Sequence, residues 1–391
     1  MEAQEAPGLS KRLIFLMACA VAASAANLYY NQPLLPVIAR DLELDKATIG
    51  WIPGMNQVGY ALAILLISPL GDVLPRRRLI DLLSVFLILG SLLAVVSGNV
   101  VMLGLASLVI GLSANITQQL LPFAATLVSA EQKARVIGTL MTGLTLGILL
   151  SRTLSGFVGE HLGWRAVYGM SAILALLFGL ALHRALPWRE PVLRMRYGAL
   201  LVSMWTLFRT HALLRKSAFT GMFWFAAFNA LWATLALHVA QEPLGYNTQQ
   251  ASMFGVVAVA GVAGAKLSGI WVSRFGARHT ISAAVVLILA GFVVSGLYGD
   301  QLWALVVGVL LIDFGVFSAQ VANQVRVFSI DPQAQSRVNG VYMLGYYLGA
   351  SLGSMSGIKA FSLAGWPGVC VLSGTYLVAS LVANNMSTRA Q

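Results

Sequence analysis

Three ionisable side chains lie inside long apolar stretches of this sequence: Asp313, Arg152 and Lys266. Apolar surroundings penalise a charged group, so such residues usually have a function. Asp313 follows about eleven residues of its stretch, which at 1.5 Å per helical residue places it deep inside. There the neutral acid is favoured unless a partner is near, as a proton carrier requires. Asp313 is therefore a candidate proton carrier, or else it forms a structural ion pair with Lys266.

Arg152 and Lys266 allow two readings each. A buried guanidinium at Arg152 favours a ligand with an anionic or carbonyl group. Alternatively, its long side chain reaches outward to carbonyl groups at the end of its helix. Lys266 lies near one end of its stretch, so the same outward reach is an alternative there.

Neutral polar and aromatic residues recur at helical spacing in several of these stretches. In an apolar medium such polar groups must face the protein interior, where they line a cavity or join helices. The aromatic stripes suit an aromatic, amphiphilic ligand, although ordinary packing also produces them. The predicted cavity residues, with Arg152, are Tyr30, Asn31, Asn115, Gln118, Phe228, Trp232, Gln320 and Tyr346.

The composition indicates a protein that lies in a membrane. Of 391 residues, 58% are hydrophobic and 10% are charged, with a mean hydropathy of +0.80. A bilayer solvates so much apolar surface, and at roughly 20 residues per span the chain has room for about twelve helices. The five histidines and two cysteines show no metal-ligand or nucleophile pattern. We therefore expect no enzyme activity, no metal and no cofactor.

The apolar stretches predict an all-α protein with two six-helix bundles. They fall near 13–38, 48–70, 79–97, 100–127, 136–159, 166–186, 217–240, 251–272, 280–298, 302–325, 338–361 and 367–386. The predicted division is 1–186, a linker 187–216, and 217–391. The linker part from Tyr197 to Leu214 is apolar on one side, which is typical of a helix lying on the membrane surface.

Basic residues predict the orientation of the chain. Lys and Arg concentrate in the linker and in alternate loops, such as Arg76, Arg77 and Arg78. Under the positive-inside rule this places both termini and the linker in the cytoplasm. The net charge of +11 is thus a membrane-topology signal, and we expect no nucleic-acid partner.

The two halves repeat at one constant offset. Gln118 matches Gln320, Arg135 matches Arg337, and the Gly-Trp pair at Gly163 matches the pair at Gly365. Parallel repeats of this kind predict alternating access around a site near the membrane midplane.

The loop Ser68-Pro-Leu-Gly-Asp72-Val-Leu-Pro-Arg76-Arg77-Arg78 resembles the signature loop of the major facilitator superfamily, Gly-x-Leu-Ala-Asp-Arg-x-Gly-Arg-Lys. Its counterpart in the second half begins at Gly269 and ends at Arg278. The resemblance implies that these residues join the cytoplasmic ends of the halves in the outward-facing state. The gate residues so implied are Asp72, Arg76, Arg77, Arg135, Arg278 and Arg337.

Further motifs resemble bacterial drug and metabolite proton antiporters of this superfamily. Gly143 and Gly147 match the start of the antiporter motif, but the Pro and the paired glycines of that motif are absent. The run Asn31-Gln-Pro-Leu-Leu-Pro resembles the corresponding run in bacterial drug or metabolite exporters. The resemblance implies a monomeric bacterial inner-membrane protein that exports a small amphiphilic or aromatic compound in exchange for protons. Proton-coupled uptake or uniport of an organic anion is the alternative, because two deep cations outnumber one deep acid.

Overall fold

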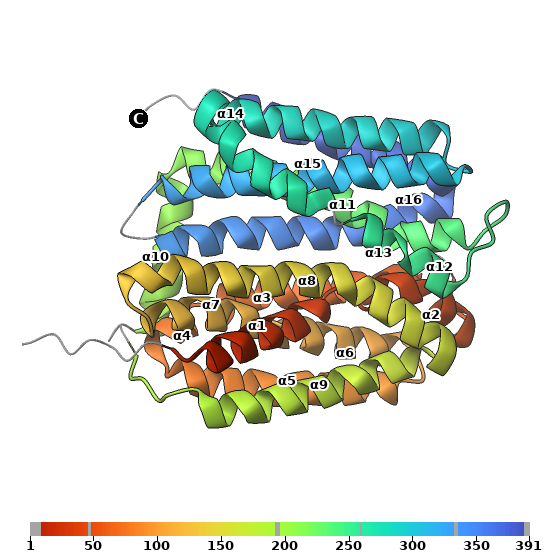
Figure 1. Ribbon diagram of the computed structural model, residues 1–391. Coiled ribbons are helices and arrows are strands. Elements are labelled where there is room, and N and C mark those ends of the chain that lie inside the picture. The colour runs from red at the N-terminus through yellow and green to blue at the C-terminus, as the bar shows by residue number, and fades with distance from the viewer. Residues whose placement is uncertain (1–8, 46–47, 192–195, 259, 332–334, 387–391) are drawn as a thin grey trace, which may run out of the picture.

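The computed structural model describes residues 9–45, 48–191, 196–258, 260–331 and 335–386. Every regular element in these ranges is a helix (Figure 1). Nine helical stretches among the described residues are long and apolar enough to cross a membrane. This confirms a helical, multi-pass membrane protein, and the count of twelve spans stays a prediction.

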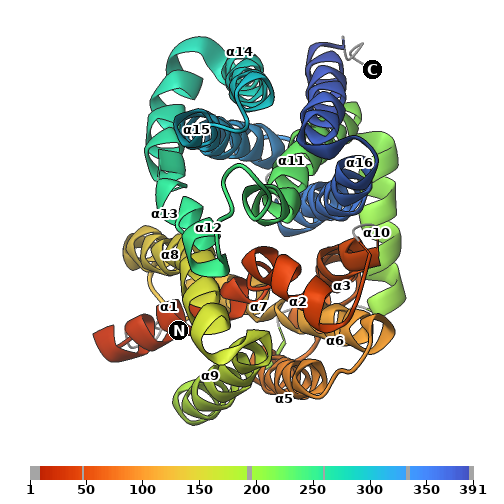
Figure 2. The same ribbon diagram turned by 90° about the vertical axis from the view of Figure 1, so that its right-hand side faces the viewer.

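The first group of helices packs mainly within itself (Figure 2). Its elements are α1 (Lys11–Ala26), η1 (Gln32–Leu34), α2 (Leu35–Asp41), η2 (Thr48–Gly50), α3 (Trp51–Leu66), α4 (Leu70–Val73), α5 (Arg76–Val95), α6 (Val100–Ser113), α7 (Ile116–Thr126), α8 (Ala130–Leu162) and α9 (Trp164–Ala185). The tightest pairs are α3 with α6, α1 with α8, and α5 with α9.

The second group follows helix α10 (Tyr197–Thr210). Its elements are α11 (Ala212–Val239), α12 (Thr248–Ser252), α13 (Phe254–Val257), α14 (Ala260–Leu297), α15 (Leu302–Phe328) and α16 (Gln335–Asn385). Here α11 packs on α16, and α14 packs on α15. We call the first group the N half and the second the C half.

Two of the long helices turn back on themselves. Gly276 in α14 has a φ of 76°, and Gly365 in α16 has a φ of 62°. Gly163, which links α8 to α9, has a φ of 82°. Positive φ strains residues with a Cβ, so glycine is required at such turns. Gly163 and Gly365 are partners in the sequence repeat, and the structure gives both the same kind of turn.

Glycine also sets the distance between paired helices. A Cβ on Gly111 of α6 would lie 2.0 Å from the Asn56 carbonyl oxygen of α3. A Cβ on Gly147 of α8 would lie 2.3 Å from the Ala22 carbonyl oxygen of α1. In a membrane, helices associate through such close backbone packing, because lipid is as apolar as their side chains.

The two ends of the bundle differ. The start of α1, the end of α16, α10 and the loop with Asp72 lie at one end, which we call the linker end; α2 and α12 lie at the far end (Figure 1). Helix α10 buries Leu200, Met204 and Leu207 instead of lying apart from the bundle. It ends at Thr210, earlier than the predicted surface helix, whose last residues start α11.

Candidate functional site

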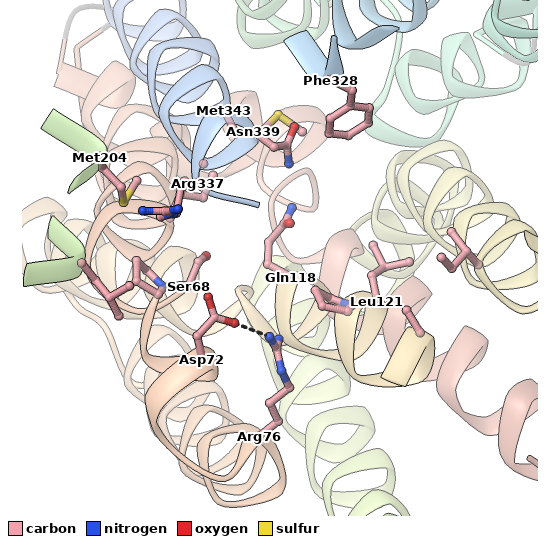
Figure 3. Close-up of a pocket in the computed structure, with 17 residues that line it drawn as sticks. Ser68, Asp72, Arg76, Gln118, Leu121, Met204, Phe328, Arg337, Asn339 and Met343 are labelled. Atoms are coloured by element: carbon pink, nitrogen blue, oxygen red, sulfur yellow. Dashed lines mark hydrogen bonds and ion pairs between the residues drawn. The ribbon is translucent and has the colours of Figure 1, made fainter. Parts of the chain in front are cut away.

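A cavity of about 410 Å³ separates the halves at the linker end (Figure 3). We call it the linker-end cavity. Its polar lining comes from the N half on one side and from α16 on the other. These residues are Ser68, Asp72, Arg76, Gln118, Arg337 and Asn339.

The charged groups of this cavity are only partly paired. Asp72 accepts a hydrogen bond from Arg76 of its own loop at 2.7 Å (Figure 3). Arg337 faces them from the C half, and no described carboxylate lies within ion-pair distance of it. Asp72 therefore binds within its own half, and the cavity separates the polar groups of the two halves at this end.

Two other predicted gate residues, Arg77 and Arg278, also bind within their own halves. Arg77 donates to the Leu186 carbonyl oxygen at 3.1 Å. Arg278 donates to the side-chain and backbone oxygens of Asn385. Arg135 is exposed, and its backbone oxygen accepts a hydrogen bond from Thr139 of the same helix. The implied gate is therefore not assembled in this conformation.

Tyrosines from both halves meet next to Gln118, which lines the cavity. Gln118 donates to the Tyr60 hydroxyl at 3.1 Å. The Tyr60 ring of α3 meets the Tyr347 ring of α16 edge-on, with centroids 4.4 Å apart. Tyr346 stacks on Phe225 at 3.6 Å, and Phe225 in turn stacks on Phe228. These rings form an aromatic layer that adjoins the cavity through Gln118.

Arg152 of α8 is buried and is 1% exposed. Its Nε donates to Gln32 Oε1 at 2.8 Å. Its guanidinium lies 3.9 Å from the centroid of the Trp232 ring and 4.8 Å from that of Tyr29. Cation–π contacts of this kind stabilise a desolvated guanidinium. Arg152 belongs to α8, so through Trp232 of α11 it joins the two halves.

Asp313 of α15 is the acidic counterpart of Arg152. It is 1% exposed, and neither carboxylate oxygen has a hydrogen-bond partner among the described residues. Arg152 of the N half is the charged group whose field reaches Asp313, although the two form no ion pair among the described residues. The structure does not bring Asp313 together with Lys266, whose side chain is exposed and forms no described ion pair. The charge interaction of Asp313 thus crosses between the halves.

The remaining predicted cavity residues do not line the linker-end cavity. Asn115 exchanges hydrogen bonds with Ser68 and Gln119. Gln320 accepts a hydrogen bond from Tyr342 at 2.6 Å. Tyr30 is buried, and the amide atoms of Asn31 have no described partner. Of the predicted set, Gln118 alone lines this cavity among the described residues.

At the far end the halves meet directly. Glu160 of α8 accepts a hydrogen bond from the Thr248 backbone N–H of α12 at 3.0 Å. Ser351 of α16 donates to the Gly54 carbonyl oxygen of α3 at 3.3 Å. A Cβ on Gly156 would lie 2.2 Å from Ser252 Cβ. The sequence reasoning missed these residues, and the protein is closed at the far end and open at the linker end.

One ion pair fixes α2 to α9 within the N half at the far end. Arg165 and the Trp164 indole both donate to Asp41, at 2.5 Å and 3.0 Å. These hydrogen bonds hold the pKa of Asp41 below its usual range. This pair supports the turn that carries α2 toward the C half.

Comparisons with known proteins are consistent along the whole chain. The model of the Major Facilitator Superfamily matches residues 17–386. The chain is 35% identical to the uncharacterised transporter YgaY of Escherichia coli O157:H7, over 96% of this chain and 95% of that protein. It is 24% identical to a probable sugar efflux transporter of Helicobacter acinonychis, over 83% and 82% of the two chains.

A solved structure shares the fold. The crystal structure of the nucleoside transporter NupG aligns with a TM-score of 0.72 and 14% identity, over 95% of this chain and 98% of that one. At this identity the likeness concerns the fold alone.

Proposed function

The chain belongs to the Major Facilitator Superfamily and is a transporter, not an enzyme, and on that premise we propose that it exports a small amphiphilic or aromatic compound in exchange for protons. The observation that carries this proposal is the burial of Asp313 in α15, where neither carboxylate oxygen has a hydrogen-bond partner among the described residues, in a protein whose halves are separated by a cavity at one end. The efflux transporter among its relatives supports the direction.

Proton coupling follows from the surroundings of Asp313. A charged carboxylate in a low-dielectric interior attracts a cation such as Arg152 beyond ion-pair distance, but it loses its hydration. When Asp313 takes up a proton, this attraction between the halves ends. The halves then separate more easily in the middle of the protein. Release of the proton restores the attraction, so one proton site can bias an alternating-access cycle.

The cavity gives the substrate a place in this cycle. In the conformation described here, a compound enters from the linker end and stops at the aromatic layer of Tyr60, Tyr347 and Phe225. Opening of the far end then releases it on the other side. The aromatic layer suits compounds with flat apolar groups, which stack on such rings.

The basic residues set the orientation of the protein in the membrane. With the linker end in the cytoplasm, the described state is inward-facing, and in the proposed export cycle this is the state that takes up the cargo. We place the protein in the inner membrane of a bacterium, as a monomer with twelve spans and cytoplasmic termini.

The alternative, uptake or uniport of an organic anion, relies on Arg152 as an anion site. Arg152 already binds Gln32, stacks on Trp232 and interacts with Asp313. An anion would have to displace these partners, so the structure favours a role in coupling for Arg152.

The test is proton release in everted membrane vesicles, screened with aromatic cations, organic anions, zwitterions and sugars. A compound that drives proton movement in the wild type but not in Asp313→Asn supports the proposal. Asp300→Asn is the matched control, because Asp300 is exposed. Equal proton movement in wild type and Asp313→Asn would rule out Asp313 as the carrier.

A further inference from the structure

A second pocket, of about 250 Å³, lies beside the linker-end cavity. We call it the side pocket. It lies between α10, α11 and α16, with Leu65 of α3 at its margin. Figure 2 shows α10 running beside both α16 and α3. Its walls are apolar side chains, among them Trp205, Phe208, Phe219 and Met222.

The side pocket is built for an apolar chain and opens toward lipid. Trp205 stacks on Phe208, and Phe208 meets Phe219 edge-on. Trp205 is 60% exposed and Phe219 is 44% exposed, in a protein that lies in a membrane. These exposed rings face the surroundings, so a lipid-dissolved chain can reach the pocket from the side.

Met204 separates the side pocket from the linker-end cavity. It lines both, and its methyl group lies 3.2 Å from where a Cβ on Gly340 would be. A methionine side chain is flexible and changes rotamer readily. The absence of a side chain on Gly340 leaves room for that movement. One elongated molecule can therefore occupy both spaces.

The charges of the linker-end cavity favour an anionic head group. Asp72 neutralises Arg76 at 2.7 Å. Arg337 has no described carboxylate partner. Arg215, close to Phe208 of the side pocket, donates to the backbone oxygens of Phe208 and Arg209 and also has no described carboxylate partner. The remaining positive charge thus lies beside an apolar pocket.

We propose that the linker-end cavity and the side pocket form one site for a single-chain anionic amphiphile that enters from the surrounding lipid leaflet. Its apolar chain lies between Trp205 and Met222, and its head group lies at Arg337. This proposal deepens the proposed function by naming the charge and shape of the cargo. It rests on that function only in treating the bound molecule as cargo.

The test measures binding without a proton gradient, in nanodiscs of zwitterionic lipid. The probe is a brominated twelve-carbon carboxylate, which quenches nearby tryptophan fluorescence. The difference between wild type and Trp205→Phe isolates the signal of Trp205. We expect saturable quenching that unlabelled dodecanoate reverses, with at least tenfold weaker competition by dodecyltrimethylammonium.

Two variants separate the parts of the site. Arg337→Gln should weaken binding of the carboxylate about tenfold or more, since hydrogen bonds to charged groups contribute about 1.5–3 kcal/mol. Arg12→Gln is the control, because Arg12 is exposed at the start of α1, at the same end of the bundle. Met204→Phe, which adds bulk between the two spaces without adding a tryptophan, should also weaken binding.

Three results would overturn the proposal. The first is quenching that dodecanoate does not reverse, because this would indicate ordinary lipid contact. The second is equal affinity for the cationic amphiphile. The third is unchanged binding of the carboxylate in Arg337→Gln. Binding should persist in Asp313→Asn. If it does while proton-driven transport is absent from the wild type, the coupling proposal fails and the amphiphile site stands.

Discussion

Closure of the far end depends on the absence of a side chain at Gly156. In the described conformation a Cβ there would lie 2.2 Å from Ser252 Cβ and 3.0 Å from the Thr248 carbonyl oxygen. Gly156→Val therefore overfills the contact between α8 and α12. This contact joins the two halves, so its overpacking penalises the far-end-closed state and leaves a far-end-open state free of it.

The size of the effect follows from packing energies. Overpacking typically costs about 1–3 kcal/mol, which corresponds to about 5–150-fold in an equilibrium between two states. Ile358 is buried where α16 meets Gly50 at the far end. In a cysteine-free background, Ile358→Cys should react with an impermeant maleimide faster in Gly156→Val by a factor in this range.

The linker end supplies the opposite readout. Asn339→Cys lines the linker-end cavity and should react more slowly in Gly156→Val, because alternating access closes one end as the other opens. Gly169→Val is the control, since nothing lies within 4 Å of a Cβ at Gly169. Unchanged labelling at Ile358→Cys, or faster labelling at both ends, would refute the reasoning.

Three further predictions concern single sites. Arg152→Lys should abolish transport in vesicle assays while the protein still folds, because an ammonium group replaces neither the Nε hydrogen bond to Gln32 nor the stacking on Trp232. Gly111→Ala should lower the unfolding temperature in detergent by an amount equivalent to about 1–3 kcal/mol, whereas Gly138→Ala, with open space around it, should not. The lowered pKa of Asp41 means that its contribution to stability is complete above the unfolded pKa of about 3.9 and is lost as pH falls through the folded pKa; Asp41→Asn should therefore flatten the fall in unfolding temperature below about pH 5.

The family and the helical membrane fold were predictable from sequence, because apolar periodicity and a repeated glycine pattern act locally. Gly163 and Gly365 show this, since the repeat paired them and both turn the chain with positive φ. The depth of Asp313 was predictable for the same reason, because the position of a residue along a long apolar helix determines how deep it lies.

Contacts between the halves were not predictable in this way. The sequence suggested Lys266 as the partner of Asp313, since both belong to the C half, whereas the structure has Arg152 of the N half acting on it. Helical spacing tells which face of one helix is polar but not how two bundles meet. Glu160 and Gly156 were missed because an acidic residue near a loop and a glycine in a glycine-rich helix are common. Only the packing of α12 against them shows that they form contacts between the halves.

The central claim is that Asp313 couples proton movement to transport. Its most direct test uses the purified protein in proteoliposomes with a compound identified in the vesicle screen. Two rates are compared: accumulation driven by a pH gradient, and exchange of labelled for unlabelled compound without a gradient. We predict that Asp313→Asn loses accumulation but keeps exchange, because exchange needs no net proton release. Accumulation at the wild-type rate in Asp313→Asn would contradict the claim.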